Sequence, residues 1–298
     1  PEFPPLDWYT LDPQNIDVLH EKAKSALMIA VDVETKLLKI NPDLIKGNPE
    51  QFRGLWFMDK QGTKKKLVPV MPIITLLSYT CLYYEEGELY SESYVLVLDD
   101  MVSVTYMRMF NELPAPKIMQ NGGYDSTYFL RYNAPLYNYI YDTYGAMHSW
   151  LSDMPRSLDF ITSLFDKYYV YWKSESNSNL PEYCAKDTHN TLWSMVYLLW
   201  SMPEYAWENY CNNFRMVFPS ICCGAEGFAI DLDERKRKHR ERLDKITTNQ
   251  KRLEHIVCEG INPNSPKQML ELLHGVGYKK AKDSADATMQ NVKDSHPV

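Results

Sequence analysis

The stretch "ALMIAVDVET", Ala26–Thr35, runs from apolar residues into two carboxylates that are two positions apart. Its apolar and β-branched composition predicts a strand in the middle of a sheet. Side chains two positions apart in a strand project from the same face, so Asp32 and Glu34 are expected side by side. Like charges placed this way repel each other unless a cation lies between them. The stretch therefore predicts a central strand that ends at a site for a basic side chain or a metal ion.

The residues around this strand predict an α/β layer fold with a mixed sheet, because strands come first and then alternate with helices. The turn "EEGE", flanked by β-branched and aromatic residues, predicts a hairpin. Residues 36–70 are rich in Gly, Pro and Lys, which indicates an inserted loop or an irregular extension. The expected strands are 27–34, 73–83, 89–98, 116–120 and 136–143, and the expected helices are 102–113, 123–133, 143–151, 156–169 and 180–202.

Length and composition predict a soluble, cytoplasmic protein. The 298 residues are 45% hydrophobic and 24% charged, and no apolar run reaches the length of a membrane span. The six cysteines show no C-x-x-C pair and no zinc spacing, which is typical of reduced thiols. The net charge of -7 argues against a passive nucleic-acid coat protein, but not against an enzyme that holds nucleic acid through metal ions. Residues 1–3 read as a remnant of an expression vector and are excluded from the fold prediction.

Three short motifs follow one another along the chain: Asp32-x-Glu34, Asn121-x-x-x-Asp125 and Tyr183-x-x-x-Asp187. Taken alone, the first is most often a strand end that caps a loop, and the third occurs by chance in many helices. A spacing of four puts both side chains of the third motif on one face of a helix, and does the same for the second motif if its helix starts as early as Asn121. Together, on a strand end and on two later helices, the motifs indicate a shared acidic site.

In these motifs the sequence resembles the DEDD-type 3′→5′ exonucleases of the ribonuclease H-like fold, in their tyrosine-bearing branch. The resemblance covers residues 20–200 and implies a five-stranded mixed sheet flanked by helices. It further implies two divalent ions, Mg²⁺ or Mn²⁺, with Asp32 bridging both. Glu34 and Asp187 would complete the shell of the first ion, Asp125 would serve the second, and Tyr183 would hold the attacking water.

Matching the positions around the motifs implies contacts with the substrate. Thr35 and Leu38 would contact the 3′-terminal nucleotide, and Asn121 would touch its sugar or phosphate. The pair Gly122–Gly123 either lets nucleic acid approach closely or delays the start of the helix. Asp142 is expected to cap the helix after it. Lysines 64–66 either guide a nucleic-acid strand or lie in a solvated loop.

The character of the chain changes after residue 203. Residues 231–252 carry nine Lys and Arg against five Asp and Glu, which predicts a long exposed helix. This α-helical C-terminal segment, with a short helix starting at Ser265–Pro266, resembles the beginning of the polymerase region of family-A DNA polymerases, at the base of the thumb. The stretch "DMPRSLDFITSLF" resembles bacteriophage versions. We expect an exonuclease domain at 4–202 and the start of a polymerase region at 203–298, without palm and fingers, from an engineered fragment or a split gene.

The leading hypothesis is a proofreading exonuclease module that hydrolyses single-stranded DNA 3′ ends and releases nucleoside 5′-monophosphates, with the missing polymerase portion as its partner and no membrane. One alternative is an RNA-trimming exoribonuclease on the same fold. The other is a non-catalytic module that binds DNA or a replication partner.

Overall fold

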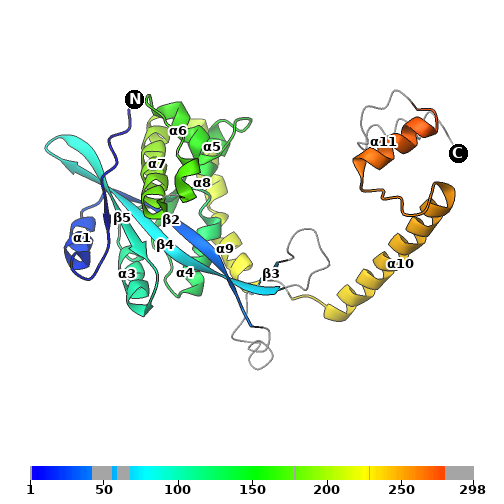
Figure 1. Ribbon diagram of the computed structural model, residues 1–298. Coiled ribbons are helices and arrows are strands. Elements are labelled where there is room, and N and C mark those ends of the chain that lie inside the picture. Colours follow the sequence, from blue (N-terminus) through cyan, green and yellow to red (C-terminus); the bar gives the residue numbers. More distant parts are fainter. Residues whose placement is uncertain (1, 42–55, 59–67, 178, 228, 279–298) are drawn as a thin grey trace. The chain divides into compact units, whose positions relative to one another are not determined.

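The computed structural model describes residues 2–41, 56–58, 68–177, 179–227 and 229–278 (Figure 1). The chain forms two compact units, Pro1–Gly227 and Phe228–Val298. The first unit contains the sheet, and the described residues of the second contain two helices.

The first unit is built on one mixed sheet in the order β1-β5-β4-β2-β6-β7, with β3 paired to β4. Its central strand β2 runs antiparallel to β4 and parallel to β6. The five predicted strands correspond to β2, β4, β5, β6 and β7, and the structure adds the short β1 and β3. The strands are β1 (Trp8–Thr10), β2 (Met28–Lys39), β3 (Trp56–Met58), β4 (Val68–Glu85), β5 (Glu88–Val97), β6 (Lys117–Met119) and β7 (Tyr139–Asp142).

Helices cover both faces of this sheet (Figure 1). One face carries α1, α3 and α4, and the other carries α5, α6, α7 and α8. The α/β class with a mixed sheet and flanking helices is therefore confirmed. The helices of the first unit are α1 (Ile16–Ala23), α3 (Met101–Asn111), α4 (Gly123–Arg131), α5 (Thr143–Trp150), α6 (Leu158–Phe165), the 3-10 turn η2 (Lys173–Asn177), α7 (Leu180–Ser201), α8 (Glu204–Phe214) and α9 (Val217–Glu226).

The expected loop at 36–70 is shorter than predicted. β2 continues through Lys39, and β4 begins at Val68, so the two strands pair as far as Lys39 and Val70. The Gly, Pro and Lys content of this region favours a loop. The backbone groups of residues 36–39 nevertheless pair with β4, which satisfies their hydrogen bonds. Lysines 64–66 lie outside the described residues.

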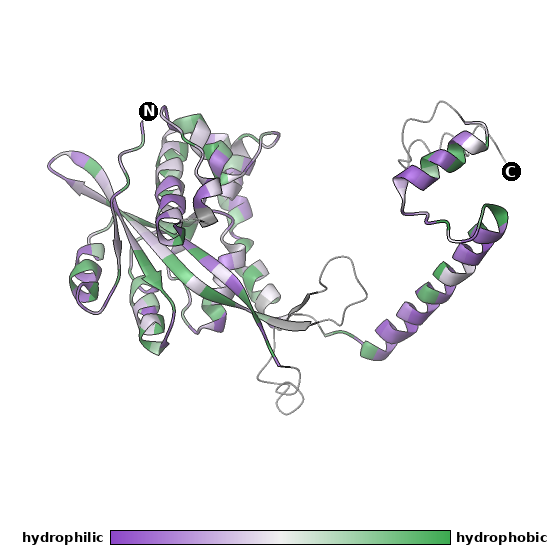
Figure 2. Cartoon of the chain, viewed as in Figure 1, coloured by the Kyte–Doolittle hydropathy of each residue, from purple (hydrophilic) through white to green (hydrophobic). Residues whose placement is uncertain are grey.

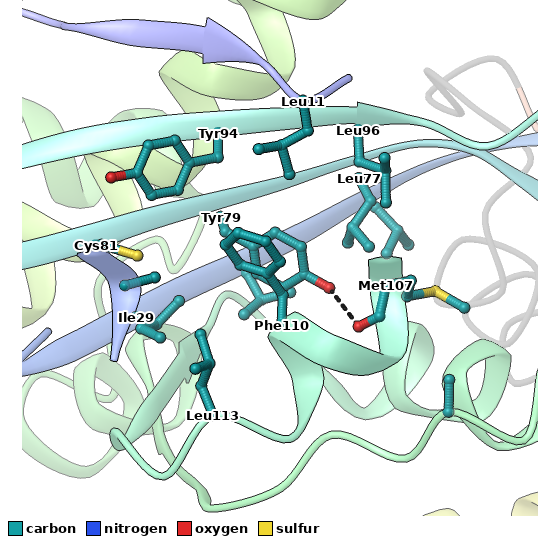
Figure 3. Packing of buried hydrophobic residues seen from close by; sticks show 14 of the residues in the cluster. Leu11, Ile29, Leu77, Tyr79, Cys81, Tyr94, Leu96, Met107, Phe110 and Leu113 are labelled. Carbon is teal, nitrogen blue, oxygen red and sulfur yellow. Dashed lines mark hydrogen bonds between the residues drawn. The ribbon is translucent and has the colours of Figure 1, made fainter. Parts of the chain in front are cut away.

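Aromatic side chains fill the core between the sheet and α3 (Figure 3). Tyr79 and Phe110 stack with ring centroids 4.9 Å apart. The Tyr79 hydroxyl donates to the Met107 carbonyl at 3.2 Å and to Asn111 Oδ1 at 2.7 Å. Because its polar end is paired, this large ring is buried without an unsatisfied hydroxyl.

Helix α7 rests on the opposite face through buried hydroxyl groups. Thr188 Oγ1 lies 2.7 Å from Ser78 Oγ and 2.8 Å from Thr80 Oγ1, and Thr80 Oγ1 lies 2.7 Å from Ser93 Oγ. All four side chains are fully buried. The bonds are directional, so they fix which side of α7 faces the sheet.

The first unit includes more of the chain than the expected domain at 4–202. Helix α8 packs against α5, and α9 packs against α4. The Tyr210 hydroxyl on α8 accepts from the backbone N–H of Asp142 at 2.8 Å. At the other end, Phe3 is buried and stacks on Tyr197 with centroids 5.5 Å apart. Phe3 is therefore part of the core, although residues 1–3 were excluded from the fold prediction.

The second unit contains α10 (Leu232–Ile256) and α11 (Pro266–Gly275). Helix α10 has no buried residue and is hydrophilic along most of its length (Figure 2). The Asp231 side chain caps it, and the Ser265 side chain caps α11. The predicted exposed helix and the helix start at Ser265–Pro266 are confirmed. Of the helices described, none combines the length and the apolar character that crossing a membrane requires.

Candidate active site

Strand β2 presents Asp32 and Glu34 on one face of the sheet. Val31 and Val33, the alternate residues, are buried on the other face. Asp32 lies opposite Ser78 of β4, and the register shifts between Glu34 and Thr35. Such irregularities re-aim side chains next to functional sites. The two carboxylates thus lie at the point where β2 leaves its regular pairing.

Helix α7 brings Tyr183 and Asp187 to the same place. The Asn179 side chain caps its first turn, and Pro181 occupies that turn, as expected for a helix start. Carboxylate oxygens of Asp32, Glu34 and Asp187 all lie within 4.8 Å of one another. The first and third sequence motifs therefore meet in space.

Asp125 is held near this cluster by the turn before α4. The side chain of Asp142 accepts from the backbone N–H groups of Asn121 at 3.2 Å and of Gly122 at 2.9 Å. It also accepts from Gly145, so the expected helix-capping role of Asp142 is confirmed. A Cβ on Gly122 would lie 2.5 Å from Met119, so this glycine is needed for close packing. Helix α4 begins at Gly123 and places the buried Asp125 in its first turn.

Burial and neighbouring negative charge raise the pKa of three carboxylates of the site. Burial raises the pKa of Asp32 well above its ordinary value, and repulsion by Asp125, Asp187 and Glu34 raises it further. Burial, followed by repulsion from Asp187, raises the pKa of Glu34. For Asp125, burial and then the charges of Asp142 and Glu34 raise the pKa to about 7. The cluster therefore holds more negative charge than its surroundings compensate.

Tyr183 borders the cluster as a neutral phenol. Burial raises the pKa of its hydroxyl above the ordinary value of 10.0, and the charge of Asp187 adds to this effect. At neutral pH the hydroxyl keeps its proton, so it can orient a neighbouring group by hydrogen bonding but cannot act as a base.

Trp172 and Lys173, which the sequence motifs did not reveal, both bind Asp187. Trp172 Nε1–H donates to Asp187 Oδ1 at 2.5 Å, and Lys173 Nζ donates to its two oxygens at 2.7 and 2.8 Å. Lys173 also donates to the Tyr183 hydroxyl at 3.2 Å. The only signal in the sequence is a tryptophan next to a lysine ahead of a polar stretch, with no spacing that ties them to the motifs.

The three residues expected to bind substrate lie on the end of β2 and in the turn before α4. Thr35 Oγ1 lies 3.4 Å from the Tyr124 hydroxyl, and Leu38 on the exposed end of β2 is 41% exposed. Asn121 is exposed with a φ of 58°. Helix α4 begins at Gly123, as predicted, so Asn121 precedes the helix and the condition for a helical face shared with Asp125 is not met.

The residues present fit a divalent metal ion. The donor set of Asp32, Glu34 and Asp187 consists of carboxylate oxygens, which hard cations such as Mg²⁺ and Mn²⁺ prefer. The raised pKa values show that added positive charge would relieve repulsion in the cluster. Asp125 adds a fourth carboxylate beside Asp32.

Of the comparisons with known proteins, only the one with solved structures finds proteins similar to this chain. Its fold is similar to that of a DNA polymerase domain. The POL domain of Pol1 from M. smegmatis, solved with DNA primer-template and dNTP, superimposes with a TM-score of 0.59 and 14% identity over 97% of this chain. This chain spans 45% of that domain. Because identity is low, the likeness shows a shared α/β fold and no more.

Two nucleases align with lower scores. RNase D from Escherichia coli has a TM-score of 0.45 and 15% identity over 97% of this chain and 73% of its own. NrnC from Brucella melitensis has a TM-score of 0.45 and 13% identity over 76% of this chain and 97% of its own. No known family and no curated protein matches the sequence itself.

Proposed function

We propose that this chain is the 3′→5′ proofreading exonuclease module of a family-A DNA polymerase, acting on single-stranded DNA 3′ ends. The observation that carries the proposal is the convergence of Asp32, Glu34 and Asp187, beside Asp125 and Tyr183, from distant parts of the sequence. The likeness of the fold to the Pol1 domain supports the polymerase context. The products would be nucleoside 5′-monophosphates.

The four carboxylates would hold two divalent ions, Mg²⁺ or Mn²⁺. Asp32 would be shared by both, Glu34 and Asp187 would hold one, and Asp125 would hold the other. When bound, such a pair stabilises the attacking and leaving oxygens of a displacement at phosphorus and acidifies water.

The protein's own side chains would position the reactants. The protonated Tyr183 hydroxyl would donate a hydrogen bond to the attacking water and so fix its direction. Leu38, whose side chain is exposed, would pack against a terminal base, Thr35 would contact the same nucleotide, and Asn121 would contact its sugar or phosphate. These contacts would keep the 3′ end single-stranded and in line with the cluster.

In this proposal, residues 4–202 form the exonuclease domain and residues 203–298 the start of a polymerase region, of bacteriophage type. The rest of the polymerase would be the partner, and the protein would act in the cytoplasm. The exposed basic residues of α10 would contact DNA phosphates in the complete enzyme.

Hydrolysis of a 5′-labelled single-stranded DNA oligomer tests the proposal, with Mn²⁺, Mg²⁺ or EDTA added to parallel reactions. We expect a ladder that shortens from the 3′ end, lost in EDTA and in Asp32→Ala but kept in Glu21→Ala, which removes an exposed carboxylate of α1, on the sheet face opposite α7. An RNA oligomer of the same sequence should be cut more slowly, and faster cutting of RNA would favour RNA trimming. If Asp32→Ala cut DNA as fast as the parent, the metal assignment would be wrong.

A further inference from the structure

The ammonium group of Lys173 lies in the acidic cluster, on the carboxylate of Asp187. It contacts both carboxylate oxygens, at 2.7 and 2.8 Å, and its side chain is 26% exposed while that of Asp187 is 9% exposed. A charge-assisted contact of this length in a mostly buried setting is stronger than an ordinary surface ion pair. Lys173 is therefore a component of the cluster and not a passing surface contact.

The charge of Lys173 reaches beyond Asp187. It lowers the pKa of Asp32 and of Glu34, against the effects of burial and of the other carboxylates. One ammonium group thus offsets part of the repulsion among three of the carboxylates. Lys173 therefore supplies part of the positive charge that the adjacent carboxylates of Asp32 and Glu34 require.

Trp172 and Lys173 act on the carboxylate of Asp187 in different ways. The indole of Trp172 is buried and donates to Oδ1, which orients the carboxylate without adding charge. Lys173 adds charge through a long flexible stem that is partly exposed, so its ammonium group can swing away while Trp172 stays in place. The backbone that carries Lys173 is tied to α7 by an ion pair between Glu175 and Lys186 at 2.5 Å.

A divalent ion on Asp187 would use the oxygens that Lys173 contacts. Two cations within about 3 Å of one carboxylate repel each other, so the ammonium group and the ion compete for it. We propose that Lys173 is a tethered counter-ion of the acidic cluster, which a divalent metal must displace from Asp187 in order to bind. This inference rests on the proposed function, and it makes Lys173 the residue that sets how tightly the site holds its metal.

The affinity of the full chain for Mn²⁺, measured by titration calorimetry without nucleic acid, tests the inference. Lys173→Met keeps the length of the stem and removes the charge, and it should bind Mn²⁺ at least about tenfold more tightly than the parent. Lys173→Arg keeps the charge and should show no such gain. Lys22→Met is the control, because Lys22 also pairs with a mostly buried carboxylate, that of Glu92, but lies on α1 and makes no contact with η2 or α7 in the described ion pairs.

Thermal unfolding in EDTA gives a second readout. Lys173→Met should unfold at a lower temperature than the parent, because the carboxylates lose their counter-ion, and Mn²⁺ should raise its midpoint more than it raises that of the parent. Circular dichroism checks that each variant is folded.

The outcomes separate this inference from the proposed function. If the parent binds Mn²⁺, Asp32→Ala does not, and Lys173→Met binds no more tightly than the parent, the metal site stands and the counter-ion inference is overturned. If neither the parent nor Lys173→Met takes up Mn²⁺, both fall together.

Discussion

Replacing Thr188 by valine should destabilise the sheet unit, because the buried hydroxyl of Ser78 loses its hydrogen-bond partner. Valine has the shape of threonine without its hydroxyl, so the change removes the group that lies 2.7 Å from Ser78 Oγ and 2.8 Å from Thr80 Oγ1. Thr80 keeps its partner Ser93 at 2.7 Å, whereas Ser78 loses the hydroxyl with which it is paired. Ser78 is fully buried between β4 and α7, where water cannot replace the lost partner.

The expected loss of stability follows from the number of buried hydroxyl groups that lose their partner, which is one. One buried unsatisfied hydroxyl costs about 1–3 kcal/mol, so Thr188→Val should lower the free energy of unfolding by that amount. Adding Ser78→Ala removes the orphan itself, and the double variant should recover most of the loss. Ser78→Ala alone should cost less, because Thr188 keeps Thr80 and the Ala185 carbonyl at 3.1 Å.

Urea unfolding in EDTA, followed by tryptophan fluorescence, measures these differences. All seven tryptophans lie at or before residue 207, so the signal reports the sheet unit and not α10 or α11. The double-mutant cycle gives the coupling between the two hydroxyls directly. A Thr188→Val variant as stable as the parent, or a double variant whose loss equals the sum of the singles, would refute the reasoning.

Three further predictions concern the candidate site. Tyr183→Phe should slow DNA hydrolysis by about ten- to a hundredfold, less than Asp32→Ala, since only an orienting hydrogen bond is lost; equal losses in initial-rate assays would contradict this. Burial and the Asp142 charge raise the pKa of Asp125 from 3.8 to about 7. At a pH between these values the folded protein keeps a proton on Asp125 that the unfolded chain has released. In EDTA the stability of the parent should therefore fall as pH rises through this window, and Asp125→Asn should show a shallower fall in urea titrations at each pH. Gly122→Ala should cost about 1–3 kcal/mol because its Cβ meets Met119, whereas Gly123→Ala, which has open space, should be neutral or stabilising; similar thermal shifts for both would count against the packing explanation.

The strands were predictable because their apolar and β-branched runs are local signals. The end of β2 was not, since Leu37 and Leu38 are exposed and belong to the strand only through their pairing with β4. Local composition favours a loop there, and a tertiary ladder overrides it. The same reason explains β3, which exists through its pairing with β4.

The carboxylates of the site were predictable because each belongs to a short motif on a regular element. Trp172 and Lys173 were not, because they reach Asp187 from the residue before η2 and from the first residue of that short 3-10 turn, where no motif spacing applies. Asn121 shows the limit of spacing rules: the interval of four from Asp125 holds, but a positive φ puts it ahead of the helix.

The separation of the carboxylates along the chain bears on how the protein folds. Asp32 belongs to the first long strand of the sheet unit, while Asp187 belongs to α7, which follows in the sequence only after β4, β5, β6 and β7. Contacts between such distant segments form slowly and late. Interactions absent from the folding transition state act on the rate of unfolding and not on the rate of folding. A cation held between β2 and α7 would therefore lengthen the lifetime of the folded protein while leaving the speed at which it folds nearly unchanged.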